Sequence, residues 1–125
     1  MRTIIFANGI MNNPDLIMKM MRKDDFLIAA DGGLEHIRKI GLQPNLVVGD
    51  FDSIDMKGQQ YLVKRRIETK QFPAEKDKTD LELAIEEAIS RGSNNLIIVA
   101  ATGGRLDQTL ANVMIMLDSK FTKVD

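Results

Sequence analysis

Aspartates recur at short intervals in this chain, and each group stands where an apolar run ends or a helical pattern begins. The five that stand out are Asp50, Asp52, Asp77, Asp80 and Asp107. Carboxylates that gather in a fold repel one another unless a cation lies among them. Magnesium takes hard oxygen ligands and is usually shared between one or two carboxylates and the phosphates of a substrate. The spacing therefore predicts an enzyme that handles magnesium and a phosphorylated substrate.

The first two acids lie in the segment 49–53, Gly-Asp-Phe-Asp-Ser, directly after an apolar run. Residues two apart in an extended chain point to the same side, so Asp50 and Asp52 can face one ion. Ser53 is a candidate phosphate contact next to them. Asp and Ser also favour a plain turn out of a strand, which is the alternative for this segment. The other acids of the chain favour the metal-binding interpretation.

The next two acids, Asp77 and Asp80, stand at the start of the clearest helical pattern, where Thr79 and Glu82 form a capping box. Acids in a first helical turn also complement the helix dipole, at about 0.3–1 kcal/mol each, and this would account for Asp80 alone. It does not account for the whole string 75–80, Glu-Lys-Asp-Lys-Thr-Asp. We therefore expect both acids to be functional.

A glycine-rich segment precedes the last helical pattern, and it reads Thr102, Gly103, Gly104, Arg105. Two glycines let the backbone approach an anion closely, and the free amides of a helix start point toward it. Arg105 adds a fixed cationic fork that suits phosphate oxygens. The alternative is a tight strand-to-helix turn with a surface arginine. Asp107 can pair with Arg105 or join the metal ligands, and the sequence leaves both open.

Polar residues also follow the first two predicted strands. Asn8 and Gly9 come after the first, and Asp31, Gly32 and Gly33 come after the second. An acid after the second strand, here Asp31, can accept a hydrogen bond from a sugar hydroxyl. The alternative is that the same residues form an ordinary turn with a helix cap. Ligands of open α/β sheets bind beyond the carboxyl ends of the strands, so we expect these residues to contact a nucleotide or its phosphates.

Short apolar runs alternate with amphipathic patterns along the chain. Continuous apolar runs indicate strands buried on both faces, predicted at 3–7, 26–30, 46–48 and 96–100, and a further, less apolar strand is predicted at 67–70. Helices are predicted at 15–22, 34–40, 56–64 and 80–90, with a further one from 106. The alternation predicts an α/β fold, a three-layer α/β/α sandwich with a mainly parallel, Rossmann-like sheet.

Composition narrows the class of protein. A length of 125 residues fits one domain, and a formal net charge of −1 offers no field for nucleic acid or an anionic membrane surface. The chain has no cysteine, and no apolar run approaches the roughly 20 residues of a membrane span. We expect a cytoplasmic protein in which the basic run 64–66 and the lone histidine, His36, are solvated.

Four motifs, in this order along the chain, resemble the bacterial type of the thiamine pyrophosphokinase (thiamine diphosphokinase) family. They are Asp31-Gly-Gly, the segment 49–53, the segment 72–80 (Phe-Pro-Ala-Glu-Lys-Asp-Lys-Thr-Asp) and Gly103-Gly-Arg-Leu-Asp. The resemblance implies magnesium-dependent transfer of the diphosphate of ATP to the hydroxyl of thiamine, with release of AMP, in a homodimer. It also implies that residues 1–125 form a single ATP-binding catalytic domain, without the C-terminal β-rich domain expected in the family.

The resemblance also implies roles for single residues. The acids that match those expected around magnesium and the phosphates are Asp50, Asp52, Asp80 and Asp107. The residues that match nucleotide contacts are Asp31 and Arg105. The residues that lie on the expected thiamine side are Lys76, Asp77 and Thr79. Asp77 or Asp80 would accept the proton of the thiamine hydroxyl. Gln108 stands where members of the family commonly have a histidine, which leaves any proton role there open.

Other protein classes stay open at this point. A haloacid-dehalogenase-type phosphatase would use Asp50 as nucleophile and Asp52 as general acid, but its motif belongs on the first strand, and here two predicted strands precede it. A nucleotide-sugar transferase would hold its metal with the same pair, but it gives no role to the segment 103–107. A nucleotide-binding fragment that is inactive alone is the alternative that is not an enzyme.

Overall fold

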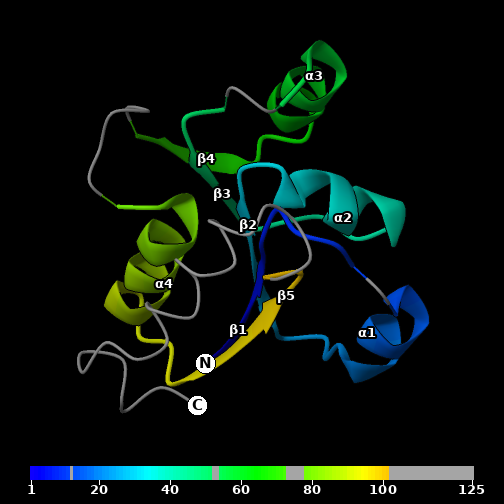
Figure 1. The fold of residues 1–125 in the computed structure, drawn as a ribbon, viewed down its shortest axis with the longest axis vertical. Coiled ribbons are helices and arrows are strands. Elements are labelled where there is room, and N and C mark those ends of the chain that lie inside the picture. Colours follow the sequence, from blue (N-terminus) through cyan, green and yellow to red (C-terminus); the bar gives the residue numbers. More distant parts are fainter. Residues whose placement is uncertain (12, 52–53, 73–77, 102–125) are drawn as a thin grey trace.

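The computed structural model describes residues 1–11, 13–51, 54–72 and 78–101. Its strands are β1 (Arg2–Phe6), β2 (Phe26–Ala30), β3 (Leu46–Gly49), β4 (Glu68–Gln71) and β5 (Asn95–Val99). Its helices are α1 (Pro14–Met20), α2 (Gly33–Lys39), α3 (Met56–Lys64) and α4 (Asp80–Ser90). The strands form one sheet in the order β4-β3-β2-β1-β5, and every neighbouring pair is parallel (Figure 1). The predicted α/β class with a parallel sheet is confirmed.

Helices cover both faces of the sheet, because the inner strands are apolar on both sides. Ile5, Ile28 and Val48 pack with α4 on one face. Ile4, Ala29 and Val47 pack on the other face with residues of α2 and α3. Figure 1 shows the same division, with α4 on one side of the sheet and α1, α2 and α3 on the other. This is the three-layer sandwich that the sequence predicts.

The strand order places the ends of β1 and β5 side by side. The chain moves from β1 to β4 in one direction and then returns to the opposite side of β1. In open parallel sheets of this kind, ligands bind outside the carboxyl ends of the strands, where the order changes direction. The topology therefore predicts that the site lies in the segments that follow β1, β2, β3 and β5.

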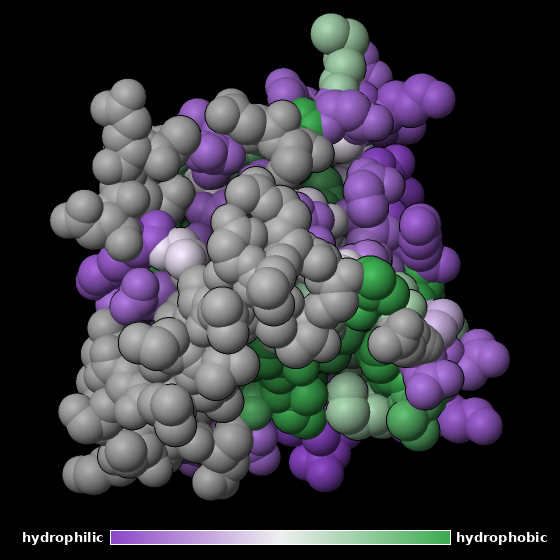
Figure 2. Space-filling view, in the orientation of Figure 1, coloured by the Kyte–Doolittle hydropathy of each residue, from purple (hydrophilic) through white to green (hydrophobic). Residues whose placement is uncertain are grey.

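The helix α1 is attached loosely compared with the others. It has no buried residue, and Leu16 is 64% exposed. A groove of about 300 Å³ beside α1 is lined by apolar side chains that include Ile17 and Ile97. The space-filling view shows apolar side chains gathered on this part of the surface (Figure 2). Among the described residues, no helix combines the length and the apolar character needed to cross a membrane.

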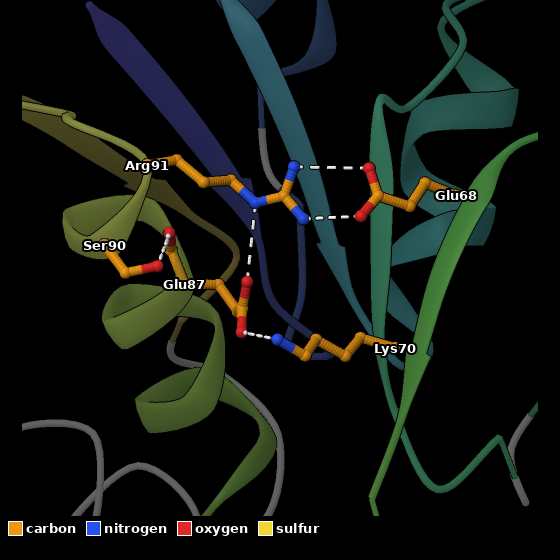
Figure 3. A network of polar contacts seen from close by, with 5 residues as sticks. All are labelled: Glu68, Lys70, Glu87, Ser90 and Arg91. Atoms are coloured by element: carbon orange, nitrogen blue, oxygen red, sulfur yellow. Dashed lines mark hydrogen bonds and ion pairs between the residues drawn. The ribbon is translucent and has the colours of Figure 1, made fainter.

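The edge strand β4 is held by charge more than by burial. All four of its residues are exposed, in contrast to the apolar inner strands. Arg91, just after α4, donates in a fork to both oxygens of Glu68 and at 3.4 Å to Glu87, while Glu87 also accepts from Lys70 (Figure 3). Hydrogen bonds from the Arg91 guanidinium hold the pKa of Glu68 below its usual value. This network of Glu68, Lys70, Glu87 and Arg91 ties β4 to α4.

We expect Glu68→Gln to lower the free energy of unfolding at pH 7 by about 0.2–1 kcal/mol, since the pair is partly exposed. The pKa of Glu68 is lower in the folded chain, so its contribution is complete above the unfolded pKa, about 4.3, and is lost as pH falls through the folded pKa. Urea unfolding at several pH values measures the difference. As a control, Glu35→Gln removes one carboxylate of an exposed pair within α2. A difference for Glu68→Gln that persists unchanged at pH 3 would contradict the ion-pair explanation.

Candidate functional site

Three carboxylates meet at the carboxyl edge of the sheet. Asp31 follows β2, Asp50 follows β3, and Asp80 is the first residue of α4. Each offers an oxygen, and these oxygens all lie within 4.8 Å of one another. All three residues are half-buried, and Asp31 Oδ1 and Asp80 Oδ1 are shielded from solvent. The sequence predicted Asp50 and Asp80 for the metal and Asp31 for the nucleotide, and the structure brings Asp31 into the same cluster.

Gly49 allows this close approach, and the sequence analysis did not single it out as a site residue. Its φ of +149° lies in a region that residues with a side chain rarely adopt. A Cβ at this position would lie 3.1 Å from Asp31 Cβ and 3.2 Å from Asp80 Oδ2. The missing side chain therefore leaves room for two carboxylates at the end of β3. The signal in the sequence is a glycine that ends an apolar run directly before an acid.

The backbone around the cluster is constrained. Asp31 has a φ of +49°, and its amide donates to the carbonyl of Val48 at 2.8 Å, which fixes it against β3. Phe51 and Ala100, which also lie at this edge, have φ values of +68° and +60°. A left-handed conformation outside glycine costs on the order of 1–3 kcal/mol and is typical of functional sites. Three such residues at one edge support its assignment as the site.

Asp80 is placed by the start of α4. The Thr79 hydroxyl accepts a hydrogen bond from the Glu82 amide at 3.1 Å, which confirms the predicted N-cap. The capping oxygen satisfies one of the free amides of the first turn and so fixes where the helix begins. Thr79 thus has a structural role, and its place on the thiamine side stays a prediction.

The glycines after β1 and β2 bring α2 directly against the end of β1. A Cβ at Gly33 would lie 1.8 Å from the Phe6 carbonyl oxygen, and one at Gly32 would lie 2.1 Å from Asn8 Oδ1. The Gly9 amide donates to the Ala100 carbonyl at 2.7 Å. Gly33 therefore serves close packing against the backbone, and Gly32 leaves room for the Asn8 side chain. Nucleotide contacts from these glycines stay a prediction.

His36 differs from the expectation of a solvated histidine. It is half-buried, and its Nε2 lies 2.7 Å from the carbonyl oxygen of Gly9. The expectation was wrong because the first turn of α2 packs against the end of β1, which also places the next turn of the helix beside Gly9. The basic run 64–66, by contrast, is exposed as predicted.

Several predicted site residues lie outside the described residues. They are Asp52, Ser53, Lys76, Asp77, Thr102, Gly103, Gly104, Arg105 and Asp107. Their roles stay predictions from the sequence.

The chemistry of the cluster suits a hard divalent cation. Each of the three residues presents carboxylate oxygen, the ligand type that magnesium prefers. Charged carboxylates this close repel one another, and a cation among them adds attractions that outweigh this repulsion. A magnesium ion keeps some positions for water or phosphate oxygens, so a site built from a few carboxylates can bind a phosphorylated ligand as well.

Comparison with known proteins identifies the family. The family model described as "Thiamin pyrophosphokinase, catalytic domain" matches residues 17–125. The chain belongs to this family. It is 32% identical over 97 residues to the thiamine pyrophosphokinase of Bacillus subtilis (strain 168), an alignment that covers 78% of this chain and 45% of that protein.

Solved structures of thiamin pyrophosphokinases have the same fold. The Bacillus subtilis structure superposes with a TM-score of 0.80 at 28% identity, over 93% of this chain and 54% of that one. The Geobacillus thermodenitrificans structure gives 0.81 at 27% identity, over 99% of this chain and 58% of that one. The yeast structure, at 17% identity and a TM-score of 0.74, shares the fold. The chain spans about half the length of these family members.

We expect Gly49→Ala to weaken divalent-cation binding, because the added Cβ would crowd Asp31 and Asp80. The matched control is Gly41→Ala, at a φ of +77° with nothing within 4 Å of the added Cβ. Both changes should lower the free energy of unfolding through backbone strain, by about 1–3 kcal/mol. Only Gly49→Ala should also reduce the affinity for Mn²⁺, measured by electron paramagnetic resonance of the free ion. Equal Mn²⁺ affinities in the two variants would contradict this account of Gly49.

Proposed function

We propose that this chain carries the nucleotide- and magnesium-binding part of a thiamine diphosphokinase. The reaction transfers the diphosphate group of ATP to the hydroxyl of thiamine and yields thiamine diphosphate and AMP. The observation that carries the proposal is the cluster of Asp31, Asp50 and Asp80 at the carboxyl edge of the sheet. Membership of the thiamin pyrophosphokinase family supplies the substrate class.

In this proposal Asp31, Asp50 and Asp80 hold magnesium, with Asp52 and Asp107 as further ligands predicted from the sequence. The fit rests on three oxygen donors within 4.8 Å and on the space that Gly49 leaves between them. When bound, the ion neutralises the charge on the phosphate oxygens. Arg105 would add a second positive charge at the phosphates, as its guanidinium suits their geometry.

The chemistry needs positioning and charge stabilisation, and no covalent enzyme intermediate. The hydroxyl oxygen of thiamine attacks the β-phosphorus, and the bond from that phosphorus to the oxygen bridging the α- and β-phosphates breaks. AMP leaves with the electron pair, and the hydroxyl proton passes to a base, for which Asp77 and Asp80 are the candidates. Catalysis of phosphoryl transfer is mostly alignment together with neutralisation of developing charge.

Further parts of the proposal concern assembly and location. We infer a homodimer and a cytoplasmic enzyme with ATP and thiamine as its substrates, on the strength of the family resemblance. This chain spans about half the length of its relatives. Binding of magnesium-ATP without transfer is the alternative that the same cluster supports.

The test is AMP release from magnesium-ATP with and without thiamine. We expect thiamine-dependent AMP that falls about 100-fold or more in Asp50→Asn, since a ligand to the cation and its charge are lost. The control is Asp24→Asn, an exposed acid in the α1–β2 connection, which should keep the parent rate. AMP that forms equally without thiamine, or release of inorganic phosphate alone, would contradict the proposal. Binding of magnesium-ATP without AMP would favour the binding-fragment alternative.

A further inference from the structure

The first half of α2 lies against the end of β1 at three successive points. Gly33 meets the Phe6 carbonyl and Gly32 meets the Asn8 side chain, each so closely that a Cβ would collide. One turn further along the helix, His36 meets the carbonyl oxygen of Gly9. Figure 1 shows β1 running from the N-terminus toward α2. The start of α2 and its N-cap Gly32 therefore contact Phe6, Asn8 and Gly9 at the end of β1.

The contact of His36 is directional. Its Nε2 lies 2.7 Å from the Gly9 oxygen, and because a carbonyl only accepts, Nε2 carries the proton and donates. On the other side of the same peptide segment, the Gly9 amide donates to Ala100 at the end of β5. The turn of Asn8 and Gly9 is thus held from two directions, by α2 and by β5. Glu35, next to His36, takes no part, because it pairs with Arg38.

This turn borders the carboxylate cluster. Asn8 is exposed, and its side chain lies against Gly32, which directly follows Asp31. We propose that His36 is a positioning residue of the nucleotide site, which holds the Asn8–Gly9 turn so that the Asn8 amide faces the bound nucleotide beside Asp31. The inference rests on the proposed function and adds to it a residue that does not itself touch the ligand.

Two substitutions separate the hydrogen bond from the rest of the side chain. Glutamine places its amide nitrogen close to where imidazole Nε2 stands, whereas asparagine places its nitrogen at the Nδ1 position and falls short of Gly9. With magnesium and α,β-methylene-ATP as the probe, we expect His36→Gln to bind within about twofold of the parent. His36→Asn should bind about three- to tenfold more weakly, the range of one lost hydrogen bond. Glu35→Gln, its neighbour on α2, should bind like the parent.

Titration calorimetry well below the unfolding midpoint of each variant gives the dissociation constants. A role in folding alone would lower the midpoint of His36→Asn and leave its dissociation constant at the parent value, and this result would overturn the inference. Equal weakening in His36→Gln and His36→Asn would overturn it too. If the parent itself does not bind the probe, the proposed function fails, and the inference fails with it.

A second measurement uses the unchanged protein and needs no variant to fold. Imidazole ¹⁵N resonances at pH 8 should show the proton of His36 on Nε2, and they should shift when the magnesium complex of α,β-methylene-ATP is added. A proton on Nδ1, or resonances that stay unmoved at saturation, would overturn the inference.

Discussion

The carboxyl edge of the sheet is organised around three carboxylates, each with an oxygen within 4.8 Å of the other two. Carboxylates this close repel one another when they are charged. A flexible chain would relieve this repulsion by moving the acids apart. Here Asp31 and Asp50 extend from inner strands that are buried on both faces, and Asp80 begins a helix whose start is fixed by a cap. Movement of any one acid would disturb a packed core, so the fold keeps the three carboxylates together. A divalent cation among them, as proposed, would offset their repulsion.

The same edge of the sheet also needs glycines where the backbone lies very close to neighbouring groups. Gly33 lies so close to the Phe6 carbonyl that a Cβ would have no room, and a Cβ at Gly49 would crowd Asp31 and Asp80. Distant contacts support these approaches. The network of Glu68, Lys70, Glu87 and Arg91 ties β4 to α4, and the amide of the residue after β4, Phe72, donates to the Gly49 carbonyl at 2.8 Å. Exposed ion pairs at the edge of the sheet therefore help to hold the surroundings of Gly49 and Asp80.

Sequence and structure agree best where a local pattern decides the outcome. Continuous apolar runs predicted the buried strands within one or two residues, and Thr79 with Glu82 predicted the start of α4. The largest departures concern residues whose surroundings come from distant segments. His36, expected to be solvated, is half-buried because α2 lies on the end of β1, and the ion pairs that hold the exposed strand β4 were not predicted. Periodicity carries no information on which distant segment covers a residue.

The sequence by itself determined the fold class, the family motifs and the identity of Asp50 and Asp80 as candidate ligands, because these follow from residue type and short-range spacing. Tertiary structure decided that Asp31 joins them and that Gly49, which has no side chain, leaves room for Asp31 and Asp80 beside it. It also decided which partner His36 meets. The physical reason is that strand order and the direction of each crossover bring together residues that are far apart in the chain, and only the packed sheet fixes the distances between them.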